Sequence, residues 1–108
     1  MTYHVVITAR AKADAMEAVR WKAERSAKVA ARWYAGLEKA IAKLRQLPER
    51  HPIAEDESER FGIIIRQMAY GRKPGTYRIL FTIEGNAVVL LYILHGARDV
   101  IGPEKGQS

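Results

Sequence analysis

The sequence predicts an α+β domain of order βααβββ, in which a helical hairpin packs on a small antiparallel sheet. Apolar residues recur with a helical period between residues 11 and 47, and an extended pattern replaces it after residue 60. Because helices and strands are segregated along the chain, an alternating βαβ fold is not expected. At 108 residues the chain fits one domain. We expect an ordered core over about residues 2–101 and a flexible tail at 102–108.

The N-terminal half carries the signals of one strand and two helices. Tyr3–Thr8 is short and rich in β-branched and aromatic residues, so a strand is expected there. Thr8 can cap a helix over about Ala11–Ser26, where small and apolar residues recur every three or four positions. A second helix is expected over Ser26–Leu47, with Ser26 as its cap, and Pro48 ends it.

The C-terminal half predicts a loop followed by a three-strand meander. Pro48–Glu59 contains two prolines and an acidic run, and is expected to be a solvated connector. Gly85 suits a tight turn between the last two strands, and the final strand is apolar enough for burial on both faces. The expected strands are Phe61–Met68, Thr76–Ile83 and Ala87–Leu94, with a basic hairpin tip at Arg72–Gly75.

The residue types that many enzymes require are missing. The chain has no cysteine, no histidine pair at a ligand spacing, no glycine-rich phosphate loop and no nucleophile elbow. We therefore expect no metal and no cofactor. No secretory leader or apolar run of membrane-spanning length occurs in the sequence, so the cytoplasm is the expected location.

The positive charge is concentrated in one stretch. The net charge is +6, and residues 60 to 80 hold five cations and no acid. Such a stretch forms either a surface for a polyanion or an acidic protein segment, or a solvated basic face. The five cations are Arg60, Arg66, Arg72, Lys73 and Arg78.

Four polar residues attached to the predicted sheet are candidates for chemistry: Arg66, Arg78, His95 and Arg98. Arg78 interrupts a strand suited to burial, so it either pairs with a carboxylate such as Asp99 or Glu84 or faces a groove. His95 is either a neutral histidine bonded to the backbone or a catalytic base. Arg98 either pairs with Asp99 or joins an anion-binding face.

Several segments, in order over nearly the whole chain, resemble the RelE/ParE toxins of type II toxin–antitoxin, or plasmid stabilisation, systems. The most specific is the Tyr-Arg-Ile-Leu-Phe strand followed by a glycine turn, an apolar strand and His-Gly-Ala-Arg. The segments are Ala11-Lys12-Ala13-Asp14-Ala15, Ala31-Arg32-Trp33 with Leu37, Leu44-Arg45-Gln46-Leu47-Pro48, Tyr77-Arg78-Ile79-Leu80-Phe81 and Leu94-His95-Gly96-Ala97-Arg98-Asp99.

This resemblance implies a fold in which the N-terminal strand joins the C-terminal meander. It also implies a cognate antitoxin whose C-terminal segment wraps the helices and the sheet, giving a hetero-oligomeric complex. A toxin of charge +6 is a suitable receptor for an acidic segment.

The resemblance leaves two targets open. RelE-like members cut mRNA on the ribosome, and in that reading Arg78, Arg66 and Arg98 would hold the phosphate. The expected C-terminal tyrosine has no counterpart after Arg98, and using His95 as the base would depart from the family pattern. A ParE-like inhibitor of DNA gyrase, without catalysis of its own, is therefore the preferred interpretation.

Two further possibilities follow from the same resemblance. Arg72 and Lys73 at the hairpin tip are candidates for contacting the target. Besides the ribosome-dependent endoribonuclease, the remaining alternative is an inactive module that still binds the antitoxin.

Overall fold

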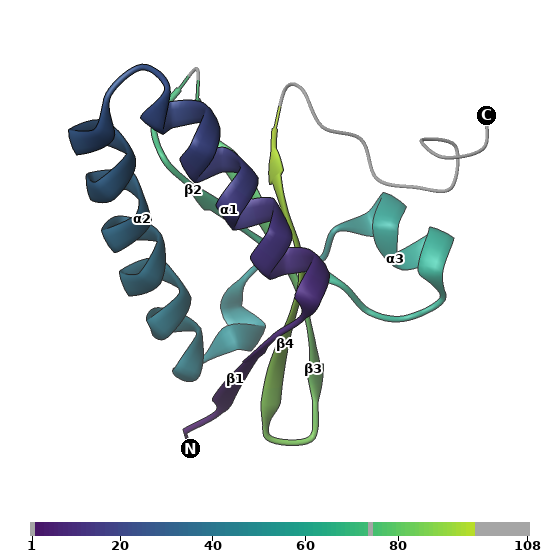
Figure 1. Ribbon diagram of the computed structural model, residues 1–108. Helices are drawn as coiled ribbons and strands as arrows, with labels where there is room; N and C mark the ends of the chain where they lie inside the picture. Colours follow the sequence, from purple (N-terminus) through teal and green to yellow (C-terminus); the bar gives the residue numbers. More distant parts are fainter. Residues whose placement is uncertain (1, 74, 97–108) are drawn as a thin grey trace.

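The computed structural model describes residues 2–73 and 75–96 and confirms the α+β class (Figure 1). Two long helices lie side by side over one face of a four-stranded sheet, and a short third helix lies beyond the sheet. The elements are β1 (His4–Ile7), α1 (Ala9–Ala23), α2 (Ala27–Ala42), the 3-10 turns η1 (Lys43–Arg45) and η2 (Pro48–Arg50), α3 (Glu55–Phe61), β2 (Arg66–Tyr70), β3 (Tyr77–Glu84) and β4 (Ala87–His95).

The strands are arranged in the order β1-β4-β3-β2. β2, β3 and β4 form the antiparallel meander that was expected, and Gly85 takes a positive φ of 61° in the turn before β4. β1 pairs with β4 in parallel, with His4 opposite Ala87 and Ile7 opposite Leu90. The sheet is therefore mixed, and its first and last strands in sequence are neighbours.

Both predicted helix caps are present. The Thr8 hydroxyl accepts a hydrogen bond from the Ala11 amide at 3.1 Å, and the Ser26 hydroxyl accepts one from Val29 at 3.2 Å. These bonds satisfy amides that have no partner inside the helix. α2 ends at Ala42, earlier than expected: the chain tightens into the 3-10 turn η1, and Gln46 already has extended backbone. Leu47 has a left-handed φ of 49° and is 66% exposed, so it does not continue the apolar stripe.

The acidic run is not the solvated loop that was expected. Residues Glu55–Phe61 form α3, and three carboxylates occupy its first turn. Negative side chains at this end are favoured because the helix dipole places partial positive charge there. Gly62, with a φ of 72°, ends the helix in the left-handed conformation.

The strand expected over Phe61–Met68 begins only at Arg66. Ile63 and Ile64 are exposed in the preceding loop, whereas Ile65 is fully buried. The Ser58 hydroxyl accepts a hydrogen bond from the Ile65 amide at 2.8 Å and donates one to the Ile65 carbonyl. α3 thus takes up the backbone groups that the extended strand would have paired.

The last strand was expected to be buried on both faces, and the sheet does have an apolar core on each face. Val88 and Leu90 of β4 belong to the core under the helical hairpin, and Leu94 belongs to the core on the α3 side. The α3-side core is completed by Ala54, Ile65 and Leu80. The two faces of the sheet therefore carry different neighbours, which decides where each candidate residue lies.

Candidate functional site

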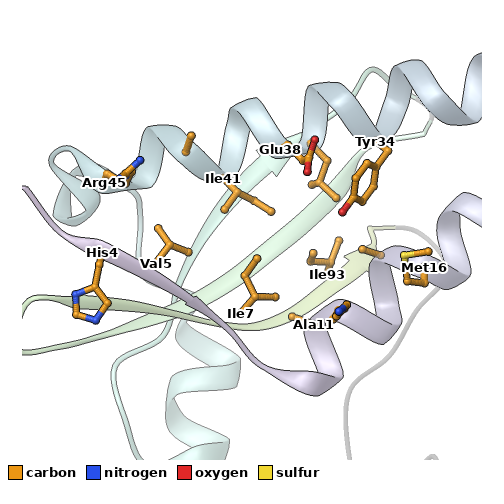
Figure 2. A pocket seen from close by; sticks show the side chains of 14 residues that line it. His4, Val5, Ile7, Ala11, Met16, Tyr34, Glu38, Ile41, Arg45 and Ile93 are labelled. Carbon is orange, nitrogen blue, oxygen red and sulfur yellow. The ribbon is translucent and has the colours of Figure 1, made fainter.

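An apolar groove of about 670 Å³ opens between β1, α1 and α2. Figure 2 shows side chains from all three elements pointing into the space between them. Ile7, Met16 and Tyr34 are partly exposed to solvent in this groove. No sequence signal identified this groove.

The groove exists because the two long helices diverge. In Figure 1 they are close at their connecting turn and separate toward β1. The inward face of α1 carries small residues, Ala11, Ala15 and Ala18, which leave the space beside Leu37 and Ile41 of α2 incompletely filled. Unfilled apolar space of this kind favours a partner that brings its own side chains.

The rim of the groove is mostly positive. Lys12 of α1 and Arg45 after α2 line it, together with His4 of β1, and Glu38 is the single acid among the lining residues. An apolar floor with a cationic rim suits an amphipathic segment that carries acidic residues on its flanks.

Arg78 lies on the other face of the sheet and is paired. Its Nε donates to the Gln67 side-chain oxygen at 2.8 Å, and its Nη2 lies 3.1 Å from a carboxylate oxygen of Glu57 in α3. Of the two alternatives, pairing is therefore what the structure displays, but with a different carboxylate from those expected. Glu84 is exposed at the far end of β3, and Asp99 lies outside the described residues.

Arg66 is on the opposite face of the sheet from Arg78. Arg66 pairs with Phe81, which belongs to the core under the helices, whereas Arg78 pairs with Ala69, three residues along β2 from Arg66. Side chains alternate along a strand, so residues three apart point to opposite faces. The Nη1 of Arg66 donates to two backbone carbonyls of the turn before α3, those of Glu49 and His51, at 3.0 and 2.8 Å.

His95 also lies on the opposite face of the sheet from Arg78. His95 pairs with Tyr77 on the helix-covered face, and the two rings meet edge to face at 5.2 Å. Arg72 and Lys73 are exposed at the hairpin tip, beyond the ends of β2 and β3. Arg98 lies outside the described residues. Arg66, Arg78 and His95 do not converge on one point.

Sequence reasoning missed a polar cluster around the turn at residues 49–51. The hydroxyl of Tyr3 donates to Glu49; this bond raises the pKa of Tyr3 and lowers that of Glu49. His51 stands edge-on to Phe81, and burial, assisted by Arg50 and Arg66, lowers its pKa. No local pattern could have revealed this cluster, since Tyr3 and Glu49 are 46 residues apart.

Residues 2–73 and 75–96 contain no group of three or more His, Asp or Glu side chains that could hold a metal ion. None of the helices in these segments is long and apolar enough to cross a membrane.

A helical hairpin on one face of a four-stranded sheet, with the N-terminal strand beside the last one, defines the class of RelE/ParE-type toxin folds. A family model described as "ParE toxin of type II toxin-antitoxin system, parDE" matches residues 5–100. The chain therefore belongs to the ParE toxin family. No curated protein matches it significantly.

Proposed function

We propose that this type II toxin acts in the cytoplasm, as one domain, by inhibiting DNA gyrase in a ParE-like manner without catalysing a reaction. The observation that carries this proposal is the separation of Arg66 from Arg78 on opposite faces of the sheet. A ribonuclease must gather its cations around one scissile phosphate and place a base beside it. Here each arginine is engaged by protein groups instead.

The cognate antitoxin is the partner that the family implies. We place the contact of its acidic segment in the groove between β1, α1 and α2. The groove offers partly exposed apolar side chains for burial and a cationic rim for charge complementarity. Burial of Met16 and Tyr34 supplies affinity, and Lys12 and Arg45 orient the acidic segment.

The test is to express the toxin alone in a bacterial host and to follow growth, plasmid supercoiling and transcript integrity. Growth arrest with altered supercoiling and intact transcripts is the expected result. Purified toxin should also inhibit supercoiling by purified gyrase. Gyrase that remains fully active over a wide range of toxin concentrations would exclude the proposal.

A ribosome-dependent endoribonuclease remains the second candidate because of one contact. The carboxylate of Glu57 lies 3.1 Å from the Arg78 guanidinium, so an acid–base group stands beside a phosphate-binding group. In that case the chain would be an enzyme, with Arg78 at the phosphate and Glu57 in proton transfer. Growth arrest accompanied by transcript cuts in phase with the codons would support this candidate, provided that the Arg78→Ala variant no longer makes these cuts. Normal growth would instead support an inactive antitoxin-binding module.

A further inference from the structure

The outer face of α2 and the C-cap residue that follows it carry a row of cations, here called the cationic stripe: Lys28, Arg32 and Lys39 of α2, and Lys43 at the start of η1. All four are exposed, and none of them forms an ion pair within residues 2–73 and 75–96. Their spacing of four, seven and four residues keeps them on one side of the helix. Ala35 occupies the position between the two pairs, so no bulky side chain interrupts the stripe.

The stripe is long and faces solvent. Lys28 and Lys43 are separated by about 22 Å along the axis at 1.5 Å per residue. The buried face of α2, with Ala30 and Leu37, points the other way, and α2 forms one flank of the molecule (Figure 1). The groove lies on a different side of α2, lined by Tyr34, Glu38 and Ile41.

Repulsion within the stripe is unfavourable for the helix that carries it, and only Lys39, in the last turn, is favoured by the helix dipole. Lys28 and Arg32, and likewise Lys39 and Lys43, are like charges four residues apart, and no acid stands three or four residues from any stripe member inside α2. Lys28 also lies in the first turn, at the positive end of the helix dipole, where no acidic residue is present. Natural proteins violate such rules of helix stability mainly at surfaces that are used for binding.

A further cation is fixed beside the start of the stripe. The guanidinium of Arg25 stacks on the Trp21 ring at 3.7 Å from its centroid, and its Nη1 donates to the Trp21 carbonyl at 3.0 Å. A guanidinium has five donors, so this stacked group is held in place and can still bind a phosphate. Because the Arg25 guanidinium is already stacked in the free protein, less side-chain entropy is lost when it binds a phosphate.

We propose that the cationic stripe of α2 binds the phosphate backbone of duplex DNA. A convex row of lysine and arginine without an apolar centre lacks the anchors of a protein interface, whose core is depleted in lysine. It matches instead the sequence-independent contacts that phosphates make with basic side chains. An α-helix also fits the major groove of B-DNA.

This inference rests on the proposed function for the source of the DNA, which is the segment held by gyrase. Because the groove and the stripe are on different sides of α2, the stripe stays accessible when the groove is filled. Binding to phosphates would hold the toxin at the enzyme–DNA complex, while other surfaces act on gyrase itself.

The experiment uses toxin separated from its antitoxin and a short fluorescein-labelled DNA duplex, with anisotropy measured between about 50 and 200 mM salt. The stripe variant is Lys28→Gln, Arg32→Gln, Lys39→Gln. Its affinity should fall on the order of 100-fold at about 0.15 M salt, and the slope of log K against log salt should decrease in magnitude by about 2.7. Its melting temperature should be no lower than that of the wild type, because the removed charges repel one another.

The matched control removes three cations that lie outside the stripe: Lys12→Gln, Arg45→Gln, Arg50→Gln. This control should keep the wild-type salt slope. An equal loss in both variants, a wild-type toxin that does not bind duplex DNA, or clear preference for single-stranded RNA would overturn the inference. So would a stripe variant that loses binding to gyrase measured without DNA, since the stripe would then contact an acidic protein surface.

Gyrase assays on the same variants separate the two proposals. DNA binding by the stripe together with unaffected supercoiling would refute gyrase inhibition and leave the DNA contact standing. A stripe variant that inhibits supercoiling as strongly as the wild type, when the wild type shows no DNA binding, would refute the DNA contact and leave gyrase inhibition standing.

Discussion

Glu57 of α3 and Arg78 of β3 form an ion pair at 3.1 Å that ties the short helix to the α3-side face of the sheet. Gln67 of β2 accepts a second hydrogen bond from the same guanidinium at 2.8 Å. Three consecutive elements, α3, β2 and β3, are thus joined through one side chain. The contact is only partly exposed, with 31% of the Arg78 and 15% of the Glu57 side chain accessible.

Replacing Glu57 with Gln should lower the free energy of unfolding by about 1–2 kcal/mol, between the values for exposed and for buried pairs. The reason is that Arg78 keeps its charge and loses the carboxylate. Urea denaturation of Glu57→Gln, Arg78→Gln and the double variant measures the coupling between the two residues. A coupling energy near zero would show that the pair does not stabilise the fold.

The effect of Gly36→Ala on stability should differ between the wild type and a Tyr70→Phe background, because Gly36 of α2 lies against Tyr70 of β2. A Cβ at Gly36 would collide with the Tyr70 hydroxyl, which donates a hydrogen bond to the Trp33 carbonyl at 2.7 Å. Gly36→Ala should therefore destabilise the wild type, despite a gain of about 1 kcal/mol in helix propensity. In the Tyr70→Phe background the same change should become neutral or stabilising. Thermal unfolding of the four proteins tests this, and equal effects in both backgrounds would contradict it.

His51 predicts a pH dependence of stability. Burial lowers its pKa below the ordinary value of about 6.5, so the unfolded chain takes up a proton before the folded protein does. The stabilising contribution is complete above about pH 6.5 and is lost as the pH falls through the lower folded pKa. Chemical denaturation between pH 7 and about pH 5.5 should show this loss.

The His51→Phe variant is the control for that measurement. The Nε2 atom of His51 is buried and has no hydrogen-bond partner among the described residues, so an apolar ring in its place should cost about 1 kcal/mol or less at pH 7. The decline in stability between pH 7 and 5.5 should flatten in this variant. An unchanged pH profile would assign the dependence to other groups.

The groove predicts a specific loss of antitoxin affinity. Met16 lines the groove and is 39% exposed, so Met16→Glu should leave the toxin folded while placing a charge where an apolar side chain docks. We expect at least about tenfold weaker binding of the antitoxin by calorimetry. Val29→Glu, at a similarly exposed apolar residue of α2 that does not line the groove, is the control and should bind as the wild type does. Equal losses in both would argue against the groove.

Predictions from sequence succeeded where the signal is local. The Thr8 and Ser26 caps and the turn at Gly85 depend on residues within a few positions, and the structure confirms them. The exposed pair Ile63 and Ile64 was assigned to a strand, because β-propensity cannot register that Ser58 of α3 takes the backbone bonds of Ile65.

The candidate site was less accessible to sequence reasoning. The position of Arg78 in an apolar strand showed that it needs a partner. That partner belongs to α3, a helix that the acidic composition of residues 55–59 did not predict. The groove depends on how far two helices diverge, and no residue pattern encodes that angle. The cationic stripe is present in the sequence as a periodicity of charge, but it can be assigned to the exposed side of α2 only once the buried face of the helix is known.

The parallel pairing of β1 with β4 determines when the sheet can be completed during synthesis. β1 is among the first segments that the ribosome releases, and its partner strand is the last element of the described fold. The groove needs both strands, since Val5 and Ile7 line one side of it and Ile93 of β4 lies among them. A half-made chain therefore has neither a complete sheet nor a complete groove. On the proposed antitoxin contact, neutralisation consequently acts on finished molecules and not on nascent ones.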